Sequence, residues 1–168
     1  MTEEEKIEGV DFSKEKLKDE KYSECIFENC NFSNVHLTEI VFSECVFENC
    51  DFSNASLGQT GFREVEFKSC KMLGLHFEHC NDFLLEFRFK DCTLDFSSFI
   101  QMKLKGLQFD NCTLVEVDFT ESDLTDAVFK NCNLEKTVFV NTLLQNACLL
   151  YTSPSPRDAT LSRMPSSA

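Results

Sequence analysis

Large apolar residues return at every fifth position along most of the chain. The first series runs without a break from Ile7 to Phe77, and the second runs from Phe89 to Leu144, two residues out of phase with the first. A smaller residue, often Cys, Val or Ala, stands two positions before many of these apolar residues. A period of five matches neither the 3.6-residue period of a helix nor the two-residue period of a simple strand. It predicts short extended segments, each ending in a corner.

Side chains alternate between the two sides of an extended segment. The large apolar residue and the smaller residue two before it are therefore predicted to point inward, while the other positions face outward or form the corner. Four such segments close a square of twenty residues. Nearly the same twelve residues occur at that distance, as SECIFENCNFSN from Ser23 and as SECVFENCDFSN from Ser43. Residues twenty apart should thus lie above one another at the strand spacing of about 4.8 Å.

This register predicts inward columns of aromatic, aliphatic and thiol side chains. No single coil could bury its own core, so stability should be cooperative along the stack. The predicted columns are Phe27/Phe47/Phe67, Phe12/Phe32/Phe52, Leu94/Leu114/Leu134, Cys25/Cys45, Cys30/Cys50/Cys70 and Cys92/Cys112/Cys132. The outward pairs Asn29/Asn49 and Asn111/Asn131 are predicted to bond neighbouring corners.

The five-residue unit resembles that of the pentapeptide-repeat family. CNFSN, CDFSN, VDFTE and SDLTD follow the family order of a small residue, Asp or Asn, Leu or Phe, Ser or Thr, and a turn residue. The resemblance covers about residues 7–147. It implies an all-β, right-handed quadrilateral β-helix (a pentapeptide-repeat solenoid), here of about seven coils and roughly 33 Å long at the strand spacing. The expected domain spans 1–147, with a cap over 1–6 and a short bulge near 81–88.

The segment KMLGLHFEHC and the Cys/Phe units are most similar to the quinolone-resistance branch of this family, which interacts with DNA gyrase. The resemblance leaves two functions open. One is a non-enzymatic, rigid acidic rod that binds a protein partner. The other is a DNA mimic that binds DNA gyrase or topoisomerase IV and modulates quinolone susceptibility. Drug-protecting members carry loops that project from the coil, whereas the unbroken period here predicts no early loop and only a wall bulge later.

The last stretch, 148–168, loses the period and contains all three prolines. Its back-translation resembles the transposon adapter of short-read sequencing libraries, so we expect a non-native or disordered tail. Family members commonly continue into a C-terminal helix that mediates dimerisation. Because this chain stops before such a helix, a homodimer is expected of a longer chain rather than of this one.

The net charge of −13 narrows the range of partners. It disfavours direct binding to nucleic acid or to an anionic membrane, and it favours a basic protein partner.

No apolar stretch approaches the roughly 18 residues of a membrane span, and the N-terminus does not read as a signal peptide. We therefore expect a cytoplasmic protein, in which ten cysteines do not predict a disulfide framework.

Acidic residues recur at the same twenty-residue spacing on the outside of the predicted coil. Duplex DNA of about 33 Å carries about 19 charges, and the charge of this chain is of the same order. The candidate partner-contact residues are Glu24, Glu44 and Glu64 at one corner, Glu28 and Glu48 one corner away, and Asp11 and Asp51 on another face.

The sequence predicts no catalytic, metal or cofactor site. It contains no Cys-x-x-Cys pair and no nucleotide-binding or hydrolase motif. His36, His76 and His79 are expected at outward or corner positions. His36 and His76 lie forty residues apart, with Ser56 between them, and are predicted to be solvated surface residues. The cysteines are predicted to act as small buried apolar residues.

Overall fold

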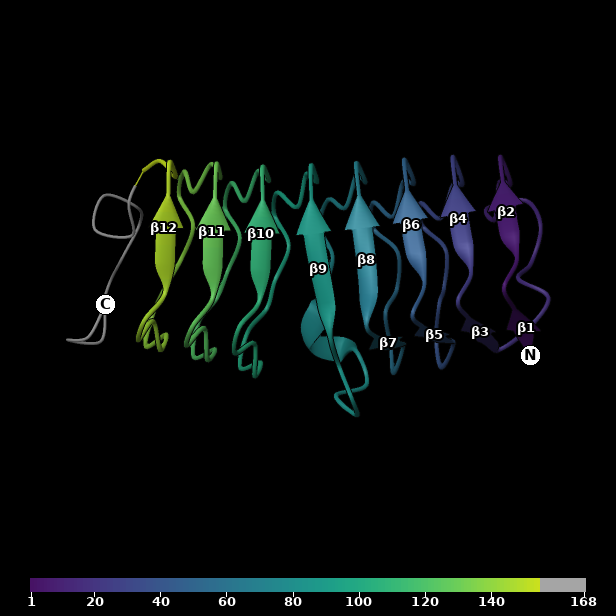
Figure 1. The fold of residues 1–168 in the computed structure, drawn as a ribbon, viewed down its shortest axis with the longest axis horizontal. Helices are drawn as coiled ribbons and strands as arrows, with labels where there is room; N and C mark the ends of the chain where they lie inside the picture. Colours follow the sequence, from purple (N-terminus) through teal and green to yellow (C-terminus); the bar gives the residue numbers. More distant parts are fainter. Residues whose placement is uncertain (155–168) are drawn as a thin grey trace.

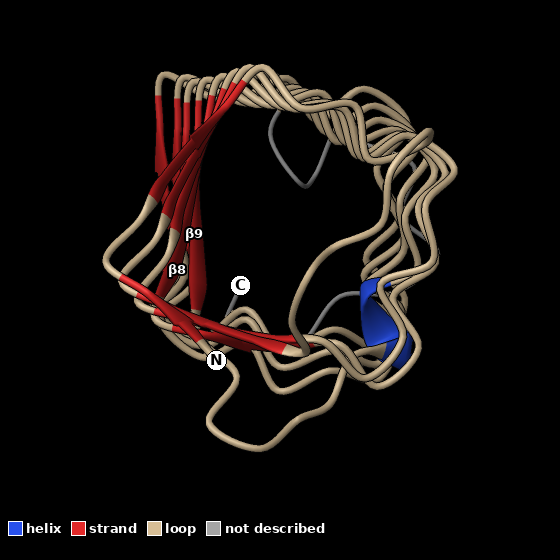
Figure 2. Cartoon of the chain, turned by 90° about the vertical axis from the view of Figure 1, so that its right-hand side faces the viewer, coloured by secondary structure: helices blue, strands red, loops and turns tan. Residues whose placement is uncertain are grey.

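The computed structural model describes residues 1–154, which wind into a four-sided tube of stacked coils (Figures 1 and 2). The predicted all-β quadrilateral solenoid of about seven coils is confirmed. Its strands are short because each wall is only one five-residue unit wide. They are β1 (Thr2–Glu3), β2 (Lys6–Glu8), β3 (Lys21–Ser23), β4 (Ile26–Glu28), β5 (Val41–Ser43), β6 (Val46–Glu48), β7 (Gly61–Arg63), β8 (Val65–Lys68), β9 (Phe87–Lys90), β10 (Gln108–Asp110), β11 (Val128–Lys130) and β12 (Cys148–Leu150).

Two parallel sheets form two adjoining walls of the tube (Figure 2). One sheet has the order β1-β3-β5-β7, and the other runs β2-β4-β6-β8-β9-β10-β11-β12. Phe27 pairs with Phe47 and Phe47 with Phe67, which confirms the twenty-residue register. The remaining walls are joined by isolated parallel bridges, such as that between Asp11 and Asn31.

The register changes by two residues between β8 and β9. Gly61 is bridged to Asn81, twenty residues on, whereas Val65 pairs with Phe87, twenty-two residues on. The two extra residues lie in the connection before β9, which extends beyond its neighbours (Figure 1). Phe83 in this connection is 60% exposed. Because strand side chains alternate with a period of two, an insertion of two keeps the inward residues inward.

The core is built from the predicted aromatic and aliphatic columns. Phe27 and Phe47 stack with ring centroids 4.9 Å apart, and Phe32 and Phe52 stack at 4.6 Å. Rings from adjoining walls meet edge to face, as Phe47 and Phe52 do at 5.0 Å. Such geometries are favoured by the charge distribution of aromatic rings. The predicted column Leu94/Leu114/Leu134 is fully buried.

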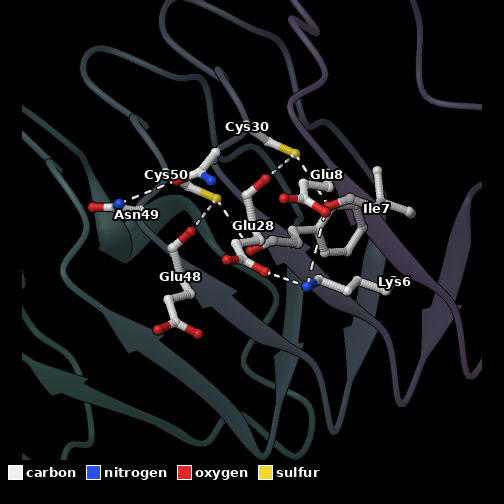
Figure 3. Close-up of polar contacts among 10 residues, drawn as sticks. Lys6, Ile7, Glu8, Glu28, Cys30, Glu48, Asn49 and Cys50 are labelled. Carbon is white, nitrogen blue, oxygen red and sulfur yellow. Dashed lines mark hydrogen bonds and ion pairs between the residues drawn. The ribbon is translucent and has the colours of Figure 1, made fainter.

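The thiol columns are also buried, and each sulfur has a backbone partner. The Cys50 Sγ donates to the carbonyl oxygen of Phe27 at 3.4 Å, twenty-three residues earlier. It also lies 3.4 Å from the carbonyl oxygen of Glu48 (Figure 3). The Cys92 Sγ donates to the carbonyl oxygen of Phe67 at 3.3 Å, twenty-five residues earlier. The predicted Cys30 and Cys92 columns therefore continue one another across the register shift. Thr60 stands at an equivalent inward position, and its hydroxyl donates to the carbonyl oxygen of Leu37 at 2.7 Å.

Left-handed backbone forms the corners. The residue two after the inward apolar residue has positive φ at successive corners, with Asn, Glu and Gln common there. Asn tolerates this conformation better than most residues. The Asn49 Nδ2 also donates to the Asn29 Oδ1 at 3.1 Å, as predicted. The Asn111 Nδ2 donates to the Oδ1 of Asp91, the corner residue one coil earlier, at 2.7 Å.

Both ends of the described chain take part in coil pairing. Thr2 pairs with Tyr22 and Ile7 with Phe27, so residues 1–6 contribute to the first coil, and a capping role stays a prediction. β12 pairs with β11, and Ser153 is bridged to Asn133. The predicted tail 148–168 thus begins inside the last coil, and its part 155–168 lies outside the described residues. The boundary after Ala147 stays a prediction.

Helical structure within residues 1–154 is limited to the single 3₁₀ turn η1 (Phe77–His79). This part of the chain contains no helix with the length and apolarity needed to span a bilayer. The turn stands where neighbouring coils have left-handed corners.

Candidate partner-binding surface

The predicted glutamate column lies on the corner between the two sheets. Glu24, Glu44 and Glu64 are exposed, and each has a φ of 52°. Glu4, with a φ of 51°, extends the column by one coil. Sequence reasoning missed Glu4 because residues 1–6 were assigned to a cap, although its spacing of twenty from Glu24 is a clear signal. We call Glu4, Glu24, Glu44 and Glu64 the acidic corner.

The backbone holds the acidic corner in register. The N–H of Glu24 donates to the Ser43 carbonyl at 2.9 Å, and the N–H of Glu44 donates to that of Arg63 at 2.8 Å. Within residues 1–154, the four carboxylates form no ion pair and accept no side-chain hydrogen bond. At about 5 Å in water, two like charges repel by roughly 0.8 kcal/mol. A basic surface docked here would relieve that repulsion.

Glu28 and Glu48, expected one corner away, are the last residues of β4 and β6, directly before the corner residues Asn29 and Asn49. Their charges are not equivalent. The Lys6 Nζ lies 2.6 Å from the Glu28 Oε2 and 3.8 Å from the Glu8 Oε2 (Figure 3). The hydrogen bond and the charge of Glu28 raise the pKa of Lys6. Glu48 is exposed and is in none of the ion pairs of the described chain. Glu48 therefore adds a free charge beside the acidic corner, whereas Glu28 is largely neutralised.

Asp11 and Asp51 lie on a different wall and serve the local turns. The Asp11 Oδ1 accepts from the Ser13 N–H and from the Asn31 Nδ2, both at 3.0 Å. The Asp51 Oδ1 accepts from the Ser53 N–H at 2.8 Å. A hydrogen bond from the Ser13 hydroxyl lowers the pKa of Asp11. These turns are the Asx type, so both carboxylates already have a structural use and are half-buried.

The three histidines are exposed, at the outward or corner positions that the sequence suggested. The sequence analysis did not foresee a contact between two of them: His76 and His79 stack with ring centroids 5.2 Å apart. The spacing His-x-x-His in HFEH was the available signal, and it falls in the 3₁₀ turn η1 rather than at a left-handed corner.

Comparisons with known proteins agree with this architecture. A family model described as a pentapeptide repeat region matches residues 40–119 and 60–139, which together exceed half of the chain. A second model, described as the SV2A/B/C luminal domain, matches residues 2–77. A comparison with curated protein sequences found no match.

Two solved structures match this chain at low sequence identity, and the first of them has the same fold. A trypsin-treated variant of QnrB1, described as a plasmid-mediated fluoroquinolone resistance protein, is 15% identical with a TM-score of 0.53, covering 88% of each chain. HetL, described as a pentapeptide repeat protein involved in heterocyst differentiation regulation in the cyanobacterium Nostoc, is 16% identical with a TM-score of 0.42. That match covers 90% of this chain and 84% of HetL. The repeat-region match over residues 40–139, together with the coiled architecture, establishes that the chain belongs to the pentapeptide repeat family.

Proposed function

We propose that this protein is a non-enzymatic, rigid acidic rod that binds a basic protein partner through the acidic corner and Glu48. The observation that carries the proposal is the row of exposed carboxylates that no cation of the described chain neutralises. Their backbone is fixed by coil pairing, so little backbone conformational entropy would be lost when a partner docks. The nine buried, unpaired cysteines support action in a reducing compartment such as the cytoplasm.

A charge-matched pair of variants tests this proposal. The triple variant E24Q/E44Q/E64Q removes three charges from the acidic corner. The control E116Q/E121Q/E135Q removes three exposed charges elsewhere on the coil. A partner recovered by affinity capture should be lost by the first variant and retained by the second, and its binding should weaken as salt is raised. Equal loss in both variants would show that only net charge matters, and it would contradict the assignment to this corner.

The second candidate is a DNA mimic that binds a type II topoisomerase, with no direct binding to nucleic acid or membrane. Two observations favour it: the likeness in fold to QnrB1, and a net charge of the order carried by a DNA segment of similar length. The even spacing of the acidic corner at about 4.8 Å per coil would present charges in a regular row.

A supercoiling assay separates the two candidates. The mimic predicts inhibition of DNA gyrase or topoisomerase IV by the wild type, reduced in E24Q/E44Q/E64Q and preserved in E116Q/E121Q/E135Q. Inhibition should fade with added salt because exposed charges are screened. A wild type that leaves supercoiling unchanged but retains a partner in affinity capture would exclude the mimic and leave the first proposal standing.

A further inference from the structure

His79 is the exception in a regular series of corners. From Glu24 to Tyr151, the corner residue of every five-residue unit has positive φ, apart from His79. At that position the chain instead forms η1, in which the His79 N–H donates to the His76 carbonyl at 3.2 Å. In a 3₁₀ turn, residues three apart lie almost directly over one another. The irregular corner therefore brings the two imidazoles to the same side of the coil.

The carboxylate of Glu78 lies between these two residues in sequence and beside them in space. Its Oε1 is 3.1 Å from the Nδ1 of His76, and the rings of His76 and His79 are inclined by only 21°. One ligand atom from each of the three residues lies within 4.8 Å of the other two. The Oε2 of Glu78 is buried and has no hydrogen-bond partner, which is unfavourable for a carboxylate oxygen.

We propose that His76, Glu78 and His79 bind one divalent transition-metal ion, of the Zn²⁺ class, at this corner. Two imidazole nitrogens and one carboxylate oxygen are a donor set that suits Zn²⁺ and its neighbours in the first transition row, and not Mg²⁺ or Ca²⁺. Water would complete the coordination. This site is separate from the acidic corner and does not depend on the proposed function.

The distances are compatible with one shared ion after small side-chain rotations. Ligand atoms around a tetrahedral Zn²⁺, at about 2.0–2.1 Å from the ion, lie about 3.4 Å from one another. The His76 Nδ1 and the Glu78 Oε1 are 3.1 Å apart, already close to that separation. The side chain of His76 is 63% exposed and His79 is also exposed, so both rings can turn toward a common ion. The 3₁₀ turn holds the ligand atoms of the three residues within 4.8 Å of one another before any ion binds.

Untagged, full-length protein tests the site by titration with Zn²⁺, with Mg²⁺ as the comparison. The chain has three histidines, so its imidazole NMR signals give a direct readout. We expect one ion per chain, with shifts in the signals of His76 and His79 and none in that of His36. H76A and H79A should each weaken binding by at least about tenfold, E78Q should also weaken it, and H36A should leave it unchanged. Since the replaced imidazoles are exposed, these variants should keep the wild-type thermal midpoint without metal.

A parallel series in the C148S variant excludes an alternative ligand, because Cys148 is the exposed thiol. The proposal is overturned if Zn²⁺ does not bind, if H76A and H79A bind as tightly as the wild type, or if binding disappears with C148S. A shift of the His36 signal equal to those of His76 and His79 would also overturn it, since that would indicate non-specific association with surface imidazoles.

Discussion

Phe27 and Phe47, twenty residues apart in the sequence, stack with their ring centroids 4.9 Å apart and their planes inclined by 14°. The rings project inward from β4 and β6, whose backbones pair in register. Phe67 continues the column at 5.3 Å from Phe47. Each ring therefore covers the one above and the one below, and the backbone pairing and the side-chain packing stabilise the same register.

Replacing Phe47 by Ala should lower the free energy of unfolding by about 3–5 kcal/mol. Phe47 is fully buried, stacks against Phe27 and Phe67, and meets Phe42 edge to face at 5.0 Å. The vacated space has aromatic rings on several sides, and the paired backbone limits collapse around it. Chemical denaturation followed by circular dichroism measures the change. E48A, which alters the exposed neighbour in the same strand, is the control and should stay within about 0.5 kcal/mol of the wild type. A comparable loss in both variants would contradict the column model.

The five-residue period predicted the coil because one local rule applies to every unit. The inward position of Phe47 and of Cys50 follows from alternation in extended chain and from closure after four units. The link between Cys70 and Cys92 was not predicted, because the period breaks between them. The structure shows that the break is an insertion of two residues, which preserves the alternation. Periodicity therefore predicts a register only where it is continuous.

The candidate site was predictable only in part, for a related reason. The column of Glu24, Glu44 and Glu64 follows from spacing alone. The neutralisation of Glu28 depends on the reach of Lys6 from one coil away, which spacing does not describe. The stacking of His79 on His76 depends on the handedness of one corner. A repeat pattern describes what successive corners share, so a single departure from it becomes visible only in the backbone angles.

Thiol accessibility should distinguish Cys148 from the other nine cysteines, which are buried. Thiolate, not thiol, reacts with disulfide reagents, and burial raises the pKa of the Cys45 thiol to about 12. Titration of the native protein with Ellman's reagent should therefore give one fast-reacting thiol, and titration in denaturant should give ten. The C148S variant should give none in the native state. Rapid reaction of several thiols in the native C148S protein would be inconsistent with a closed core.

Stability should decline on the alkaline side. The pKa of Cys45 rises from 9.0 to about 12 on burial, and burial also raises the pKa of Cys132. Above the unfolded pKa, the unfolded chain releases thiol protons that the folded chain keeps, so the free energy of unfolding falls as pH rises. For Cys45 this loss spans pH 9 to 12, and below pH 9 its contribution is fully present.

Urea midpoints measured across that interval would show the decline. The matched variant is C45T, because Thr60 already occupies an equivalent inward position with its hydroxyl bonded to a carbonyl. C45T should flatten the alkaline slope while leaving the neutral-pH fold intact. An unchanged slope in C45T would assign the decline to other groups.

Two glycine corners share the left-handed backbone and differ in the space available for a side chain. Gly74 and Gly106 both have left-handed backbone, with φ of 67° and 77°. A Cβ on Gly74 would lie 2.8 Å from the Asn54 Oδ1, whereas a Cβ on Gly106 would meet nothing within 4 Å. G74A and G106A should share the cost of left-handed backbone, and G74A should lose about 1 kcal/mol more through the contact. Adding N54A to G74A should remove that difference, because the contact partner is then gone, and a double-mutant cycle of unfolding free energies measures it. If G106A were as destabilising as G74A, the backbone alone would limit these corners, and Asn54 would have no part in choosing glycine at position 74.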